Sequence, residues 1–379
     1  MSDLQQALPG LLAWATQATL CGLIGGGLWL YLNRSHRSIL PPQRYRLVPW
    51  GSIEMLIVLF MLFFLFPILF LGLLARTGFL TWVYGSDFPI PFLSADSETL
   101  PKTVTGRWDL WVQFFSFPLQ AACIPVILRL GSGTRLYQLG LTCHRWVEDI
   151  AAACLLWLVL VPLVFGVDIV ATWCFKSWLE VKPSEHVLIQ LALGQPTQGE
   201  LIAVITIAVV AAPIVEELLF RGMLQNWLAA QPWGGAIAFA ASGGLAIVFG
   251  WKDSGFWPLA FVLLTAPGYY YLSGVSWRWL PRPDATRAVF GTSLLFAVFH
   301  SSVWPSPIAL FILALGLGFL AYRTQSLLGP ILLHSLFNGV TAIAIFYMPL
   351  VQDSANGKEM TSAVFRVPSL SNCWFVPAS

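Results

Sequence analysis

The chain has 379 residues, of which 57% are hydrophobic and only 10% are charged, and its mean hydropathy is +0.75. Soluble globular domains carry about 25% charged residues, so this composition excludes a soluble fold and indicates a polytopic membrane protein. The formal net charge of +2 is too small to indicate a nucleic-acid partner.

Apolar runs between polar or Pro/Gly breaks define the predicted spans, because a helix that crosses a bilayer needs roughly 20 mostly apolar residues. The sequence therefore predicts an all-α fold, a polytopic transmembrane helix bundle of about 8 to 10 spans. In chain order the candidate spans are 11–32, 52–75, 110–130, 147–175, 200–230, 235–250, 257–274, 287–302, 306–322 and 328–349.

Charge placement at the ends of these spans predicts the topology. The first ten residues contain Asp3 and no Lys or Arg, so they lack the basic region of a signal peptide, and 11–32 is expected to be a retained helix. Most arginines fall on one side of the predicted membrane, which we take as cytoplasmic, and this places both termini on the non-cytoplasmic side. The six cysteines are scattered, without a CxxC pair, and indicate neither a disulfide framework nor a zinc site.

Three ionisable residues interrupt the apolar run 200–230: Glu216, Glu217 and Arg221. An ionised side chain at the bilayer centre costs about 2.5 to 3.5 kcal/mol, so each of them needs a partner or a wet cavity. Glu217 and Arg221 are four residues apart and can form a structural ion pair on one helix face. Glu216 lies about 100° around the helix from Glu217, which leaves one carboxylate without a local partner.

Later apolar spans supply the side chains that can share a site with Glu216. His300 lies near the end of 287–302, and the span 328–349 carries His334 and Asn338 four residues apart, hence on one face. Each residue alone is typical of an ordinary helix–helix hydrogen bond. Together they predict a buried polar site inside the bundle. Asp168 is a further intramembrane carboxylate and so a functional candidate, although the sequence names no partner for it.

These residues form three motifs that resemble those of the CPBP family, the CAAX-processing and bacteriocin-processing intramembrane endopeptidases. EExxxR stands here at 216–221, FxxxH at 296–300 and HxxxN at 334–338. The resemblance covers roughly 200–230 and 287–345, and 84 residues separate Glu216 from His300, more than the family usually has.

The resemblance implies a division of the chain. Residues 1–199 are expected to hold about four N-terminal spans. Residues 200–349 would form a CPBP-like protease core with an unusual insertion near 235–285, and 350–379 a polar tail.

The function implied is intramembrane hydrolysis of peptide bonds by an activated water in a polar cavity of the bundle. Glu216 is the expected general base, and His300 would orient the water or protonate the leaving amine. His334 and Asn338 would donate hydrogen bonds to the oxyanion, while Glu217 and Arg221 support the Glu216 helix.

A second use of the same residues involves a metal. Two histidines and a carboxylate, Glu216, His300 and His334, can hold a divalent ion such as zinc, whose bound water would then be the nucleophile. We favour the metal-free chemistry, because the motifs lack HExxH and suit a glutamate base.

Two other classes of protein also place charges in a membrane. A proton- or ion-coupled transporter uses intramembrane Glu, His and Asp, but it predicts internal repeats, which the sequence does not show. A non-catalytic scaffold would keep the Glu217–Arg221 pair and tolerate loss of His300. As an endopeptidase, the protein is expected to meet membrane lipid and a peptide or protein substrate, prenylated or not, in the plasma membrane of a bacterium.

Overall fold

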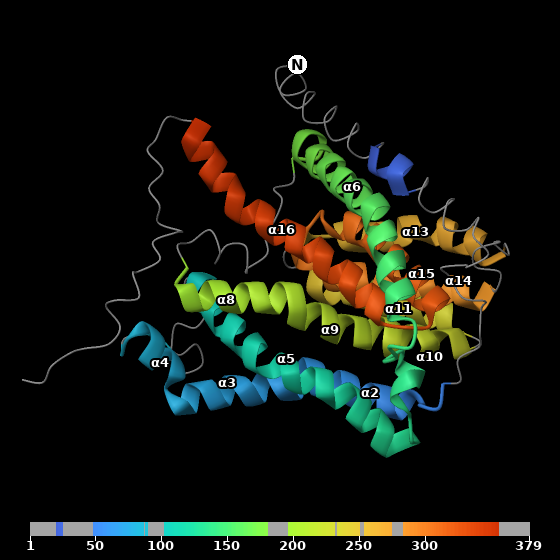
Figure 1. Ribbon diagram of the computed structural model, residues 1–379, viewed down its shortest axis with the longest axis horizontal. Helices are drawn as coiled ribbons and strands as arrows, with labels where there is room; N and C mark the ends of the chain where they lie inside the picture. The colour runs from blue at the N-terminus through green and yellow to red at the C-terminus, as the bar shows by residue number, and fades with distance from the viewer. Residues whose placement is uncertain are drawn as a thin grey trace, which may run out of the picture.

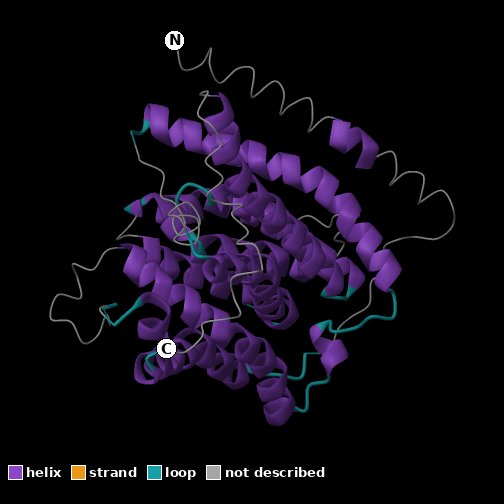
Figure 2. Ribbon diagram, turned by 60° about the vertical axis from the view of Figure 1, so that its left-hand side comes forward, coloured by secondary structure: helices purple, strands orange, loops and turns teal. Residues whose placement is uncertain are grey.

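A computed structural model of the chain describes residues 20–25, 48–86, 88–89, 102–180, 196–231, 233–250, 254–274 and 283–355. All the regular structure in these ranges is helical, as Figure 2 shows. The all-α prediction is therefore confirmed for the part of the chain that is described.

The helices of the described residues fall into three groups along the chain. In the N-terminal part they are α2 (Ser52–Phe60), η1 (Met61–Leu65), α3 (Phe66–Thr77), α4 (Phe79–Tyr84), α5 (Lys102–Ser132), η3 (Leu136–Leu139) and α6 (Trp146–Trp178). A second group continues with α8 (Gln198–Thr206), η4 (Ile207–Ala211), α9 (Ala212–Glu217), η5 (Leu218–Leu224), α10 (Gln225–Ala230), α11 (Gly234–Leu245) and η6 (Ala246–Gly250). The last group is α13 (Trp257–Gly274), α14 (Pro283–Phe299), η7 (Ser301–Val303), α15 (Pro307–Thr324) and α16 (Leu328–Ala355).

Each predicted span from 52–75 onward coincides with a helix or a continuous series of helices. Five of these are long and apolar enough to cross a membrane: Ser52–Thr77, Thr103–Ser132, Trp146–Trp178, Gln198–Ala230 and Pro307–Thr324. Among the described residues, three shorter apolar helices lie at Gly234–Val248, Ala285–Phe299 and Leu328–Ile343. Of the predicted span 11–32, only 20–25 lies within the described residues, and it is helical. The number of spans, 8 to 10, remains a prediction.

The two faces of α2 and α3 show the burial pattern of a helix between lipid and protein. Val58 and Leu62 are 0% and 4% exposed, whereas Ile53 and Ile68 are 72% and 66% exposed on the other face. In Figure 1, α2 and α3 run alongside α5 in the opposite direction, so the start of α2 and the end of α5 lie together. Lipid can cover the outward apolar face because these helices satisfy their backbone groups internally.

Residues 198–230 form one continuous helix, called here the glutamate helix, which passes from α-helical to π-helical winding twice along its length. Its α-helical turns α8, α9 and α10 alternate with the π-helical segments η4 and η5. The short segment α9, which ends with Glu216 and Glu217, therefore lies between two wider segments. Such π segments within α-helices are often found at functional sites.

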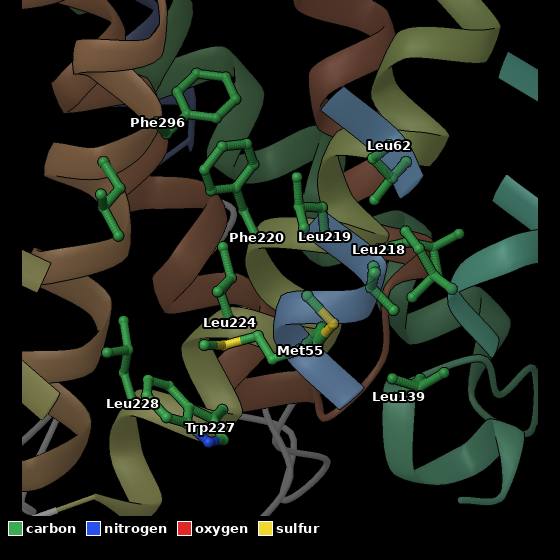
Figure 3. Packing of buried hydrophobic residues seen from close by; sticks show 14 of the residues in the cluster. Met55, Leu62, Leu139, Leu218, Leu219, Phe220, Leu224, Trp227, Leu228 and Phe296 are labelled. Carbon is green, nitrogen blue, oxygen red and sulfur yellow. The ribbon is translucent and has the colours of Figure 1, made fainter. Parts of the chain in front are cut away.

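The main hydrophobic core encloses η5 and α10. Leu218, Leu219 and Met223 of η5 are each at most 3% exposed. Figure 3 shows Met55 of α2, Leu62 of η1 and Leu139 of η3 packed around this segment. The core thus surrounds the turn that follows the two glutamates and fixes its position in the bundle.

A short polar ladder joins the glutamate helix to α15. Arg221 Nη2 donates to the carbonyl of Ala314 at 3.3 Å, and Gln225 Nε2 donates to the carbonyl of Gly318 at 3.0 Å. Both donors and both acceptors are four residues apart, so the two contacts repeat along the facing helices. A Cβ at Gly318 would lie 2.8 Å from Gln225 Oε1, so glycine permits this close approach.

A network around Glu200 anchors the other end of the glutamate helix. The buried Glu200 carboxylate accepts hydrogen bonds from Arg107 Nε at 2.7 Å, from the Tyr84 hydroxyl at 2.8 Å and from the Thr197 N–H at 2.7 Å. Burial raises the pKa of the Tyr84 hydroxyl, which therefore keeps its proton and donates. Trp111 Nε1 donates in turn to the Tyr84 oxygen at 2.9 Å, so α4, α5 and α8 are held together.

We expect Glu200→Gln to lower the free energy of unfolding by about 1.5 to 3 kcal/mol, the range for hydrogen bonds to a charged group. Thermal unfolding in one detergent measures it. The matched control is Glu148→Gln, because Glu148 is 47% exposed and 4.0 Å from Arg145, and such surface pairs contribute about 0 to 1 kcal/mol. Equal losses in the two variants would contradict the anchoring role.

Candidate active site

The two adjacent glutamates have different surroundings. The Glu217 side chain is 0% exposed, and its Oε1 accepts a hydrogen bond from Arg221 Nη1 at 2.8 Å, the ion pair that the spacing predicts. Arg221 is 1% exposed, and its guanidinium lies 4.7 Å from the centre of the Phe296 ring. The Glu216 side chain is 26% exposed. The acid without a local partner is thus also the accessible one.

His334 of α16 connects both glutamates. Its Nδ1 lies 2.9 Å from Glu217 Oε1, and its Nε2 lies 3.8 Å from Glu216 Oε2. A carboxylate only accepts hydrogen bonds, so Nδ1 carries the proton, and in the neutral ring Nε2 faces Glu216 as an acceptor. The sequence analysis paired Glu217 only with Arg221. The structure adds that Glu217 orients an imidazole.

His300 ends α14 and is held by its own motif. Its Nδ1 is 2.8 Å from the carbonyl of Phe296, one turn earlier, which requires a proton on Nδ1 and leaves Nε2 unprotonated in the neutral ring. The Phe296 ring centre lies 4.8 Å from that of His300 and 5.7 Å from that of His334. Both histidines therefore lie around one phenyl ring.

The same phenyl ring joins two of the three motifs. Phe296 and Phe220 pack edge to face, with ring centres 5.2 Å apart and planes at 77°. Figure 3 shows the two rings facing each other between α14 and the glutamate helix. Both rings are buried, so they exclude water from the side of Arg221.

Asn338 contacts the glutamate helix two turns before Glu216. Its Nδ2 donates to the carbonyl of Ala208 at 2.8 Å. In η4 the N–H of Ala212 bonds the carbonyl of Ile207, five residues back, so the next donor in this pattern would be residue 213 for Ala208. That residue is Pro213, which has no N–H. Asn338 supplies the missing hydrogen bond, and its amide keeps a second N–H.

The predicted site residues are therefore gathered from three helices. Glu216 and Glu217 both approach His334, and Arg221 is connected to it through Glu217. His300 is connected to His334 through the Phe296 ring, and Asn338 lies one turn beyond His334. Asp168 is separate: it lies on α6, with the Ser306 side chain as hydrogen-bonding partner and Oδ1 buried without one. The polar cavity expected around these residues stays a prediction.

Sequence reasoning missed two polar residues beside the site, Gln225 and Asn226. Gln225 extends the Arg221 ladder, and its spacing of four residues from Arg221 could have indicated this. Asn226 Nδ2 donates to the carbonyls of Arg221 and Gly222 at 3.1 and 2.7 Å, within the π-helical segment η5. No sequence pattern marks that role.

The residues named for a metal do not form a suitable ligand set. Within the described part of the chain, no three His, Cys, Asp or Glu side chains are placed to hold an ion together. His334 Nε2 approaches Glu216, and both histidines use Nδ1 in a hydrogen bond, to Glu217 and to the Phe296 carbonyl, so Nε2 is the only ring atom that each could offer a metal. We therefore derive no chemical step through a metal, and metal binding stays a hypothesis for direct measurement.

The unequal burial of the glutamates predicts unequal effects on stability. We expect Glu217→Ala to cost about 3 to 5 kcal/mol, because it leaves Arg221 buried without its counter-ion. Glu216→Ala should cost less than about 1 kcal/mol, since this side chain is partly exposed and forms no direct hydrogen bond. Thermal unfolding of both variants in the same detergent compares them, and a larger loss in Glu216→Ala would contradict the assignment.

Comparison with protein families finds a match over the part of the chain that contains this site. Residues 198–280 and 269–340 match the Rce1-like family, described as type II CAAX prenyl endopeptidase Rce1-like. The two matched segments overlap at residues 269–280, which lie within the region 235–285 that is expected to hold an insertion. No curated protein and no solved structure matches the chain.

Proposed function

Because the chain carries a Rce1-like domain across 198–340, in line with the CPBP family of intramembrane proteases, we propose that it is an intramembrane endopeptidase whose general base is Glu216. It would hydrolyse peptide bonds of a membrane-associated substrate, either a prenylated CAAX-type protein or a peptide. The several apolar helices make it an integral membrane protein.

One observation carries this proposal. Glu216 Oε2 and His334 Nε2 are 3.8 Å apart, too far for a direct hydrogen bond and suited to a bridging water. A water in this gap would be held by a carboxylate that can take its proton. Glu216 is also the accessible acid of the cluster, so a substrate carbonyl can approach it.

The protons balance in a simple sequence. Glu216 takes a proton from the water as its oxygen attacks the scissile carbonyl, and a tetrahedral oxyanion forms. Collapse of this intermediate breaks the C–N bond, and the leaving amine takes the proton that Glu216 removed from the water, either directly from Glu216 or relayed through His300 Nε2, which is unprotonated in the neutral ring. The Glu217 carboxylate keeps His334 in the orientation that points Nε2 at the water, as an acid orients a histidine in other hydrolases.

Two side chains would stabilise the oxyanion. Asn338 has one N–H engaged by Ala208 and a second one left to donate. His334 would donate from Nε2 while that nitrogen holds the proton that Glu216 has taken from the water. In a water-poor site each such donor contributes about 10² to 10³ in kcat, because no solvent competes for the charge.

For the location we keep the topology drawn from the arginines. The protein would lie in the plasma membrane of a bacterium, with both termini outside and the end of α5 on the cytoplasmic side. Orientation is measurable by cysteine labelling from each side of the membrane.

The direct test uses the purified full-length protein and a farnesylated CAAX reporter peptide, with the unprenylated peptide beside it. We expect Glu216→Gln and His300→Ala to lower kcat/KM by about 10² to 10⁴, because each removes a proton-transfer group. Glu148→Gln, which changes an exposed carboxylate outside the three motifs, should cleave normally. Wild-type activity in both site variants would rule out this mechanism. Metal bound in equal amount to the wild type and lost in both variants would favour a metalloenzyme instead.

Pro213 gives a second, independent prediction. In Pro213→Ala the restored N–H can bond the Ala208 carbonyl within the helix and so compete with Asn338. This change would displace Glu216, which lies three residues after position 213. We expect kcat to fall about tenfold or more from this misplacement, while thermal stability is kept or raised because proline disfavours a helix interior. The combined Pro213→Ala and Asn338→Ala variant should lose little more than each alone. Full kcat in Pro213→Ala would contradict the role of this contact.

A further inference from the structure

We propose that a groove between the end of α5 and η3 binds one phospholipid with an anionic headgroup. The groove has a volume of about 780 Å³ and is lined from Pro125 of α5 to Leu136 of η3. None of its lining residues belongs to the proposed active site, and lipid binding there does not depend on the protease chemistry.

The walls of the groove suit an acyl chain. Val126, Leu130 and Leu136 are 52%, 81% and 57% exposed, so the apolar lining is open at the surface of the bundle. The helix α5 is one of the five that are long and apolar enough to cross a membrane, and it ends at Ser132. The groove therefore lies where the hydrocarbon region gives way to headgroups, and its chemistry changes at the same level.

Two arginines at this level suit a phosphate. Arg129 and Arg135 both line the groove, and both are exposed. Arg129 Nη1 donates to the carbonyl of Gly133 at 3.0 Å, which fixes the side chain against the turn and leaves further guanidinium N–H groups for an anion. Planar guanidinium groups bind phosphate oxygens through paired hydrogen bonds.

The charged side chains that line the groove are both positive. From residue 110 to residue 147 the sequence contains three arginines and no Asp or Glu. The carboxylate that approaches this corner is Glu54 of α2, beside Gly131, and its Oε2 already accepts a hydrogen bond from the Gly51 N–H at 3.0 Å. An anionic headgroup is therefore favoured over a zwitterionic one, whose ammonium group would meet the arginines.

The groove rests on a rigid part of the fold. Leu139 of η3 is 0% exposed in the core around η5, and Gly140 accepts a hydrogen bond from the Leu327 N–H at 2.8 Å. A Cβ on Gly222 would lie 3.1 Å from the Leu139 carbonyl, so this corner packs closely on the glutamate helix. The two arginines thus stand on a fixed frame, and a bound lipid would contact that frame.

Native mass spectrometry of the full-length protein tests the proposal, with dioleoyl-phosphatidylglycerol and dioleoyl-phosphatidylcholine as the two probes. We expect preferential retention of phosphatidylglycerol. The double variant Arg129→Gln, Arg135→Gln should weaken its binding about tenfold to thirtyfold, as expected for two basic residues near a charged headgroup. The double variant with lysine at both positions should keep most of the preference.

The control is the variant Arg76→Gln, which should bind phosphatidylglycerol as the wild type does. Arg76 is an exposed arginine in the last turn of α3, at the opposite end of a spanning helix. Val126→Trp fills the groove without changing charge and should weaken binding even if the glutamine variant proves unstable. Equal binding of the two lipids by the wild type, or undiminished phosphatidylglycerol binding in both the glutamine and tryptophan variants, would overturn the proposal.

Discussion

The buried contact of Glu217 with both Arg221 and His334 is the constraint around which the second half of the chain is built. A buried arginine in an apolar bundle is stable only beside its counter-ion, so Glu217 cannot be moved without cost. The same carboxylate oxygen also receives His334 Nδ1, which brings α16 against the glutamate helix. The Ala314 carbonyl completes the surroundings of Arg221 and brings in α15. Three helices thus meet at one ion pair.

This arrangement separates the work of two adjacent residues of identical chemistry. Glu217 points into the bundle, where it is buried and forms an ion pair with Arg221. Glu216, about 100° around the helix, is partly exposed and faces the second nitrogen of the same imidazole. The buried Glu217 carboxylate thereby holds His334 opposite the accessible Glu216 carboxylate. Replacing either glutamate should therefore disturb different properties of the protein, and the doublet is not redundant.

Local relations in this chain could be predicted from sequence, and distant ones could not. The helices and the Glu217–Arg221 pair follow from apolar runs and a spacing of four residues, and the structure contains both. The contact of His334 with Glu217 joins residues 117 positions apart, and no spacing rule reaches that far. Within the predicted span 200–230, the π-helical segments η4 and η5 wind more widely than an α-helix, which the apolar run does not indicate. The division at 199 and 349 remains a prediction.

Pro213 shows how the fold and the site depend on each other. Within a membrane every backbone carbonyl must find a donor in the protein, because lipid supplies none. Proline removes a donor from the glutamate helix at the point where its winding is already wide, and the Ala208 carbonyl is left to be satisfied from another helix. Asn338 meets this need, and in doing so its amide is held in one orientation beside His334. A local defect in one helix thus fixes a side chain of another, and the defect lies three residues before Glu216. The backbone of the glutamate helix therefore accounts for an asparagine at position 338, and the same contact fixes its amide for the role proposed above.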